Sequence, residues 1–337
     1  MKAKAVFTTL QGNSIIGKVY SPPSKALLER SLDFVAPFYK MEDIGVHAGE
    51  WKNVEYFFST WGVPALAENQ LEEFFPNLKA VFYAAGSVQY FARPYLKRGV
   101  RVFSAGEANA IPVIEFTAAQ IFLANKGYFQ AARLYSGGNR EEAGKFCANV
   151  PGNAGIAVGI IGAGMIGRGV IEKLRQGRLK INVFDPFLNG ADLQKMGANK
   201  VETLDELFSG SFVISNHLAD NEQTRGILQY RHFAQMHDYG VFINTGRGAQ
   251  VDEEGLVRAL REKPTRTALL DVTWPEPVPP GHAFYSMDNV LLSPHIAGTI
   301  NNECIWMGEY IAEEYQRLVN GEPLRSEVTE NILLTMA

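Results

Sequence analysis

The stretch that most constrains this chain is a glycine-rich turn between a short apolar run and an amphipathic segment. The apolar run covers 156–161 and predicts a buried strand, and Gly162, Gly164 and Gly167 follow it as a G-x-G-x-x-G pattern. Gly162 would allow a tight turn, Gly164 would let the backbone approach a pyrophosphate, and Gly167 would let the next helix pack closely on the strand. The helix N-terminus would then offer N–H groups to the phosphates. This context predicts a site for a dinucleotide cofactor.

A carboxylate follows at a spacing that supports this interpretation. Asp185 ends the next predicted strand, 180–184, and lies 185 − 167 = 18 residues past Gly167. That spacing is typical of the acid that binds the ribose hydroxyls. The residues from Pro186 to Asn189 include no Arg or Lys that could bind a 2′-phosphate, so the sequence predicts NAD rather than NADP. The alternative is a glycine turn in some other α/β unit.

The rest of the chain predicts two domains. Its 337 residues suit two domains, and 1–105 already reads as alternating strands and helices without a glycine fingerprint of its own. From about Ala154 a second unit begins, with strands expected near 156–161, 180–184, 211–217, 240–245, 267–272 and 289–293. We therefore expect an α/β fold with two Rossmann-like domains built on parallel sheets.

The expected domains are interleaved along the chain. A long helix is predicted from Pro112 to about Tyr135, followed by a surface connection over 137–155. A last helix, starting near Asn301 and reaching about Val319, comes after the strands of the second unit and would return to the first. This order predicts a discontinuous substrate-binding domain and an inserted NAD-binding domain, with the boundaries 1–115 and 300–337 for the former and 116–299 for the latter.

Composition excludes several classes of protein. The formal net charge is −4 and no basic run is present, which argues against nucleic-acid binding. Cys147 and Cys304 are the two cysteines, and they fit neither a disulfide framework nor a metal motif, so no metal is predicted. No window reaches the roughly 18 apolar residues of a membrane span. We expect a cytoplasmic protein.

Three side chains downstream of the glycine loop could supply catalytic groups. Arg247 lies between two glycines after a predicted strand, where it could bind a carboxylate through two hydrogen bonds. Glu276 lies between two prolines that would stiffen its backbone, and His295 follows the last predicted strand, where it could act as a general acid or base. For each, an ordinary structural or surface role is the alternative. His217 also ends a predicted strand and is the back-up histidine.

Several motifs agree in order with one known family. They are Gly-Ala-Gly-Met-Ile-Gly with Asp185-Pro186, Gln223-Thr-Arg-Gly226, Asn-Thr-Gly-Arg247-Gly with Val-Asp252-Glu, Leu-Asp271-Val with Glu276-Pro277, and Ser-Pro294-His295-Ile-Ala-Gly298. Together they resemble the D-isomer-specific 2-hydroxyacid dehydrogenases, which use NAD. The resemblance covers most of the chain and is strongest from about residue 154 to 300.

This resemblance implies roles for individual residues. Arg247 would bind the substrate carboxylate and carbonyl, His295 would protonate the carbonyl oxygen, and Glu276 would pair with His295. Asp185 would bind the adenosine ribose. The remaining cofactor-binding residues would be Gly162, Gly164, Met165, Ile166, Gly167, Leu218, Thr245, Gly246, Asp271, Ala297 and Gly298. The loop of Gly86, Ser87 and Val88 would hold the substrate carboxylate through its backbone N–H groups. A homodimer is also implied.

The implied reaction is hydride transfer between NAD(H) and the α-carbon of a 2-hydroxy or 2-oxo acid of D configuration. The sequence departs from the family pattern in two places that concern the substrate. After Gly86 the usual second glycine and Asp are missing, and Thr273 stands before Trp274 where an aromatic residue is usual. We expect glyoxylate, hydroxypyruvate or a similar small acid, and 3-phosphoglycerate and bulkier aromatic or branched 2-oxo acids remain open as alternatives. The alternative of another class is an NAD(H)-sensing binding protein, similar to the corepressors of this fold, without substantial turnover.

Overall fold

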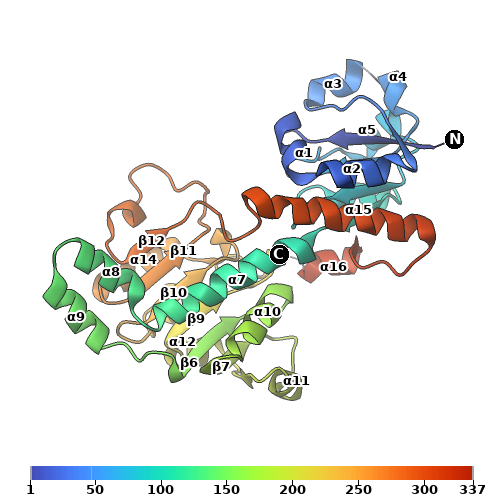
Figure 1. The fold of residues 1–337 in the computed structure, drawn as a ribbon. Helices are drawn as coiled ribbons and strands as arrows, with labels where there is room; N and C mark the ends of the chain where they lie inside the picture. Colours follow the sequence, from blue (N-terminus) through green and yellow to red (C-terminus); the bar gives the residue numbers. More distant parts are fainter. Residues whose placement is uncertain (1, 47, 336–337) are drawn as a thin grey trace. The chain divides into compact units, whose positions relative to one another are not determined.

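The computed structural model describes residues 2–46 and 48–335. The chain forms two compact units (Figure 1). Unit 1 contains the residues up to Ala110 and those from Thr299 onward, and unit 2 is Ile111–Gly298. Each unit is an α/β structure around one sheet, and the sheets are parallel apart from one short strand. The predicted fold class is confirmed.

Unit 1 contains a six-stranded sheet in the order β13-β5-β4-β3-β1-β2, in which β13 alone runs antiparallel. The order β2-β1-β3-β4-β5 is that of a doubly wound fold. The strands are β1 (Ala3–Thr8), β2 (Leu32–Phe34), β3 (Val54–Ser59), β4 (Ala80–Tyr83), β5 (Arg101–Ser104) and β13 (Glu327–Val328). The helices are α1 (Asn13–Val19), α2 (Pro22–Glu29), α3 (Met41–Val46), α4 (Ala48–Trp51), α5 (Glu68–Phe74), α6 (Ala92–Lys97), α15 (Cys304–Asn320) and α16 (Glu330–Thr335).

Helix α15 belongs to unit 1 although it follows unit 2 in the chain. Figure 1 shows it in red beside α2. Its Tyr315 is buried edge-on against Phe58 and Phe82 of the sheet, with ring centroids 5.6 and 5.5 Å away. Phe82 in turn stacks on Phe103 at 4.7 Å. Aromatic packing of this kind buries a large apolar area and favours these geometries, so it fixes the last long helix on the sheet.

Unit 2 contains a seven-stranded parallel sheet in the order β12-β11-β10-β9-β6-β7-β8. Counted from the first strand of the unit, this is the order of a dinucleotide-binding fold extended by one strand. The strands are β6 (Ala154–Ile161), β7 (Arg178–Phe184), β8 (Asn199–Lys200), β9 (Val213–Asn216), β10 (Val241–Asn244), β11 (Thr267–Leu270) and β12 (Val290–Leu292). The six predicted strands are present. The additional strand, β8, has two residues and is too short to show a hydrophobic period.

The long helix predicted over 112–135 is wrong in both its start and its length. Helix α7 (Gly106–Ala124) begins earlier and contains Pro112, and a separate α8 (Tyr128–Ser136) follows it. Gly127 divides them because its backbone is left-handed, with φ +66°. The predicted connection over 137–155 likewise contains α9 (Arg140–Ala148).

The other helices of unit 2 connect its strands, as the alternating pattern predicted. They are α10 (Met165–Leu174), α11 (Gly190–Lys195), α12 (Leu204–Ser209), α13 (Tyr230–Phe233) and α14 (Glu253–Glu262). Within the described ranges, no helix has both the length and the apolar character needed to cross a membrane.

A close approach between α15 and α1 yields a test of this packing. A Cβ on Gly308 of α15 would lie 2.1 Å from the carbonyl oxygen of Val19, so Gly308→Ala should lower the free energy of unfolding by about 1–3 kcal/mol. The matched control is Gly17→Ala in α1, where nothing lies within 4 Å and the loss of glycine freedom should be neutral or stabilising. Urea unfolding of both variants measures this. Equal midpoints would contradict the close packing of α15.

Candidate active site

The glycine loop joins β6 to α10 at the point where the strand order reverses. Gly162 has φ +84°, and a Cβ there would lie 2.9 Å from the His217 carbonyl oxygen. A Cβ on Gly167 would lie 2.1 Å from the Gly162 carbonyl oxygen, whereas nothing lies within 4 Å of one on Gly164. The turn therefore requires a glycine at 162, and the packing of α10 requires one at 167. Gly164 leaves open space at the start of α10. This loop fits the pyrophosphate of a dinucleotide.

Asp185 directly follows β7 and is tied to the glycine loop. Its carboxylate accepts hydrogen bonds from the backbone N–H of Ala163 at 2.8 Å and of Phe187 at 2.9 Å, one on each oxygen. Because each carboxylate oxygen has two lone pairs, both retain capacity for the hydroxyls of a ribose. The position and the chemistry of Asp185 fit the predicted role.

A buried network of three amide side chains holds the next two loops, and sequence reasoning missed it. Asn216 ends β9 and Asn244 ends β10, and Asn216 Nδ2 donates to Asn244 Oδ1 at 3.0 Å and to Gln250 Oε1 at 2.6 Å. Gln250 Nε2 donates to the carbonyl oxygens of Leu218 at 3.0 Å and Ala219 at 2.9 Å. All three amides are fully buried, so their mutual bonds fix both loops.

Arg247 follows β10 in the second of these loops. Its backbone N–H donates to Gln250 Oε1 at 3.3 Å, and its Nη1 donates to the Gly246 carbonyl oxygen at 2.7 Å. Burial lowers the pKa of Arg247, and the charges of Asp220 and Glu276 raise it. The guanidinium remains a cation because its ordinary pKa is far above neutrality. Arg247 thus places a partly desolvated positive charge at the carboxyl edge of the sheet.

A buried carboxylate positions the loop that carries His295. Asp271 follows β11, and its Oδ1 accepts from Ser293 Oγ at 2.6 Å and Ile296 N at 2.9 Å, while Oδ2 accepts from Ala297 N at 2.9 Å. The His295 N–H donates to the Asp271 carbonyl oxygen at 3.1 Å. His295 itself has φ +52°, a conformation uncommon outside glycine, which these bonds hold in place. The carboxylate of Asp271 therefore positions the His295 loop, and the cofactor contact that the resemblance implies for Asp271 stays a prediction.

His295 and Glu276 form a hydrogen-bonded pair. The Nδ1 of His295 lies 2.7 Å from Glu276 Oε1, and both side chains are exposed within unit 2. No described residue bonds the Nε2 of His295. The turn before Glu276 is held by Glu253, whose Oε1 accepts from Trp274 N at 2.8 Å. This arrangement suits acid–base catalysis, because the carboxylate orients the ring and leaves Nε2 for a reacting group.

The remaining predicted cofactor residues lie on the same edge of the unit 2 sheet. They occupy the first turn of α10 and the loops that follow β9, β10 and β12. Leu218, Thr245 and Ala297 are buried, and Thr245 Oγ1 lies 3.0 Å from Thr117 Oγ1 of α7. Met165, which is half exposed, and Ile166 begin α10, and Gly246 and Gly298 lie in the loops after β10 and β12. The carboxyl edge of a parallel sheet is where such folds bind ligands.

The predicted substrate loop lies in unit 1, after β4. Gly86 and Ser87 are half-buried, and the Gly86 carbonyl oxygen accepts from Ser104 Oγ at 2.5 Å. Val88 is fully buried in the core, and its carbonyl oxygen accepts from Phe91 N at 3.2 Å and Ala92 N at 3.0 Å. The Val88 side chain is thus part of the core, so Val88 could serve the predicted role only through its backbone N–H group.

His217, the back-up histidine, is unsuited to acid catalysis near neutral pH. It is buried, and its Nε2 lies 2.9 Å from Ser215 Oγ. Burial lowers the pKa of His217 from 6.5 to about 3, so the ring is neutral at physiological pH. Of the two histidines that end predicted strands, the geometry favours His295.

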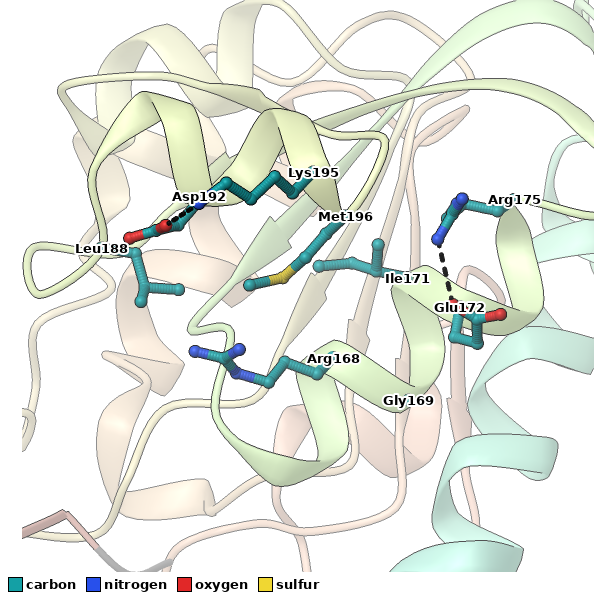
Figure 2. Close-up of a pocket in the computed structure, with 9 residues that line it drawn as sticks. All are labelled: Arg168, Gly169, Ile171, Glu172, Arg175, Leu188, Asp192, Lys195 and Met196. Carbon is teal, nitrogen blue, oxygen red and sulfur yellow. Dashed lines mark hydrogen bonds and ion pairs between the residues drawn. The ribbon is translucent and has the colours of Figure 1, made fainter.

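A hollow of about 710 Å³ lies beside α10, away from the residues described above (Figure 2). Arg168 points into it from α10 toward Leu188 in the loop after β7, and its Nε donates to the Ala163 carbonyl oxygen at 2.9 Å. The other two cations of the hollow, Arg175 and Lys195, each pair with an acid of their own helix. Of these three cations, Arg168 is the one that the structure bonds to the glycine loop.

The strand order, the glycine loop and Asp185 define a nicotinamide-dinucleotide-binding unit. Residues 119–297, more than half of the chain, match the family model of the D-isomer specific 2-hydroxyacid dehydrogenase, NAD binding domain. The chain belongs to this family, and the family prediction is confirmed. NAD is the cofactor of the matched domain, as the sequence predicted.

Individual relatives carry different substrate names. The chain is 29% identical to the D-3-phosphoglycerate dehydrogenase of Archaeoglobus fulgidus over 69% of its length, and spans 43% of that relative. It is also 29% identical to the glyoxylate reductase of Thermofilum pendens, with 77% of each chain covered. The D-mandelate dehydrogenase of Rhodotorula graminis has a similar fold, with a TM-score of 0.81, 18% identity and 98% of each chain covered.

The buried His217 should make stability depend on pH. The pKa of His217 in the folded protein lies below the value of 6.5 expected in the unfolded chain. Above pH 6.5 the ring is neutral in both states, so its burial does not make the stability depend on pH. As pH falls from 6.5 toward 3, the unfolded chain binds a proton that the folded protein does not, and the free energy of unfolding decreases. At pH 4 this loss amounts to roughly 3 kcal/mol. Chemical unfolding at pH 7 and pH 4 should show a smaller difference in His217→Gln than in the unmodified protein. An identical difference in the two proteins would contradict the burial of a neutral ring.

Proposed function

We propose that the protein is an NAD-dependent D-2-hydroxyacid dehydrogenase, which interconverts a 2-oxo acid and the 2-hydroxy acid. The observation that carries this proposal is the His295–Glu276 pair, whose Nδ1 and Oε1 atoms lie 2.7 Å apart. The pair lies on the same sheet edge as Arg247, and the Glu276 carboxylate raises the pKa of that arginine. A cation for a carboxylate and an acid–base pair for a carbonyl oxygen are what this reaction requires. Unit 1 would be the substrate-binding domain and unit 2 the NAD-binding domain, with boundaries near 115/116 and 299/300.

Each residue would have a separate task. Arg247 binds and orients the substrate carboxylate through its planar guanidinium. The Nε2 of His295 donates a proton to the carbonyl oxygen during reduction and takes it back during oxidation. Glu276 holds the ring through Nδ1 and stabilises its protonated form. NADH, when bound, supplies the hydride that reaches the α-carbon. Per turnover, one 2-oxo acid, one NADH and one proton give one 2-hydroxy acid and one NAD⁺.

The relatives leave the acid open, since their names include a phosphorylated acid and a small unphosphorylated one. A panel of 2-oxo acids, followed by the decrease in NADH absorbance, tests the proposal. Turnover of at least one acid is expected. Tight NADH binding without turnover of any acid would instead favour the NAD(H)-sensing protein. The homodimer and the cytoplasmic location stay predictions, as do the roles of Gly86, Ser87 and Val88.

Replacing the proposed acid should remove most of the rate. His295→Ala should lower kcat for reduction by about 10²–10⁴-fold while NADH binding is retained, because no other group would protonate the carbonyl oxygen. His237→Ala, which removes an exposed histidine of the same unit, is the matched control. A near-normal rate in His295→Ala would exclude this histidine as the acid.

The Glu276 carboxylate should orient the catalytic ring. Its Oε1 lies 2.7 Å from His295 Nδ1, so replacing the carboxylate should leave the ring without its charged partner. We expect Glu276→Gln to lower kcat for reduction by at least about tenfold, with NADH binding unchanged. A kcat equal to that of the unmodified protein would contradict the pairing of Glu276 with His295 during turnover.

Asp185 should determine the choice of cofactor. A 2′-phosphate would be repelled by its carboxylate, so kcat/KM with NADH should exceed that with NADPH by at least about tenfold. Asp185→Ser should reduce this preference. The matched control is Asp192→Asn, which removes an acid on α11 and should leave the preference unchanged. Comparable kcat/KM with both cofactors in the unmodified protein would refute the prediction.

A further inference from the structure

We propose that Asp220 is a specificity-determining residue that restricts the substrate to 2-oxo acids with a single negative charge and excludes phosphorylated ones. This inference rests on the proposed function and deepens it by naming the charge class of the substrate. Asp220 lies four residues past the end of β9 (220 − 216 = 4), in the loop that contains Leu218. No role was predicted for it from the sequence.

The loop around Asp220 is held firmly on both sides. Before it, the Ala219 carbonyl oxygen accepts from Gln250 Nε2 at 2.9 Å and from Thr224 Oγ1 at 2.7 Å. After it, Asn221 Oδ1 accepts from Thr224 N at 3.1 Å. Gln250 also accepts from the backbone N–H of Arg247. One buried amide therefore positions the Asp220 loop and the Arg247 turn relative to each other.

The Asp220 carboxylate is placed where it affects Arg247 but does not neutralise it. Burial lowers the pKa of Arg247 and the charge of Asp220 raises it, but among the described residues no ion pair joins these two side chains. Its Oδ1 is inaccessible to solvent and has no hydrogen-bond partner in the described structure. The negative charge of Asp220 is therefore not compensated by a hydrogen bond to this oxygen, and it acts on its surroundings at nearly full strength.

These features discriminate between substrates by charge. The charged groups that act on Arg247 are the two carboxylates Asp220 and Glu276. Glu276 also pairs with His295, the proposed proton donor, so these two charges compensate each other when the ring is protonated. Arg247 can balance one substrate carboxylate. A phosphate on the same substrate would add negative charge near Asp220 without an unpaired cation among these groups to balance it. An uncharged substituent avoids this repulsion.

The test compares two acids that differ only by a phosphate: hydroxypyruvate and 3-phosphohydroxypyruvate. The measured quantity is the ratio of kcat/KM for the phosphorylated acid to that for the unphosphorylated one. The unmodified protein should have a ratio well below one, and Asp220→Asn, which removes the charge at nearly constant shape, should raise it about tenfold. Asp192→Asn on α11 changes the net charge equally and should leave the ratio unchanged. A ratio above one in the unmodified protein, or an equal ratio in Asp220→Asn, would overturn the proposal.

Two further measurements keep this test separate from that of the proposed function. Binding of both acids to the NADH-bound protein, followed by NADH fluorescence, should show the same change in ratio even if no acid is turned over. If no acid is turned over but Asp220→Asn still changes the binding ratio, the proposed dehydrogenase activity is refuted, and the exclusion of phosphorylated acids by Asp220 is supported. If Asp220→Asn does not fold, the unmodified protein suffices, because salt screens repulsion and the ratio should rise with ionic strength. A ratio independent of salt would then contradict the proposal.

Discussion

The proposed catalytic edge of unit 2 depends on one buried set of hydrogen bonds, the amides of Asn216, Asn244 and Gln250. Parallel strands end side by side, but the loops that leave them have no partner in the ladder and would otherwise move independently. Here two strand ends are joined through side chains, with Asn216 Nδ2 bonded to both other amides. Because buried amides are costly when unpaired, the three select one arrangement of the Leu218 loop and the Arg247 turn.

The neighbouring strand pair uses a charge for the same purpose. Asp271 is almost inaccessible, and its carboxylate accepts three hydrogen bonds from the loop that contains His295. Three donors compensate the desolvation of one carboxylate, so its removal would leave them unpaired and release a histidine held at positive φ. The position of the proposed acid is thus determined by a residue that need not touch the substrate, and the Glu276 turn receives comparable support from Glu253.

The sequence predicted those parts of the structure whose causes are local. Apolar runs located the strands of unit 2, and three glycines indicated a turn that the structure forms with φ +84° at Gly162. Contacts between distant residues were not predictable. Gln250 bonds carbonyl groups 31 and 32 residues away, and nothing in its local pattern distinguishes it from a surface glutamine. Gly127 divides α7 from α8, and a Cβ there would lie 3.1 Å from the Phe146 ring, a restriction that exists only after folding.

The same limit explains why the motifs identify a family and leave the substrate open. The glycine loop, Arg247, Glu276 and His295 serve any acid of this kind, because a carboxylate and a carbonyl are common to all of them. What separates one acid from another is the charge and shape around the rest of the molecule, and that depends on residues outside the motifs. Asp220 is such a residue: its loop is held by Gln250 through the Ala219 carbonyl oxygen, and its carboxylate changes the electrostatic balance around Arg247 without changing the reaction.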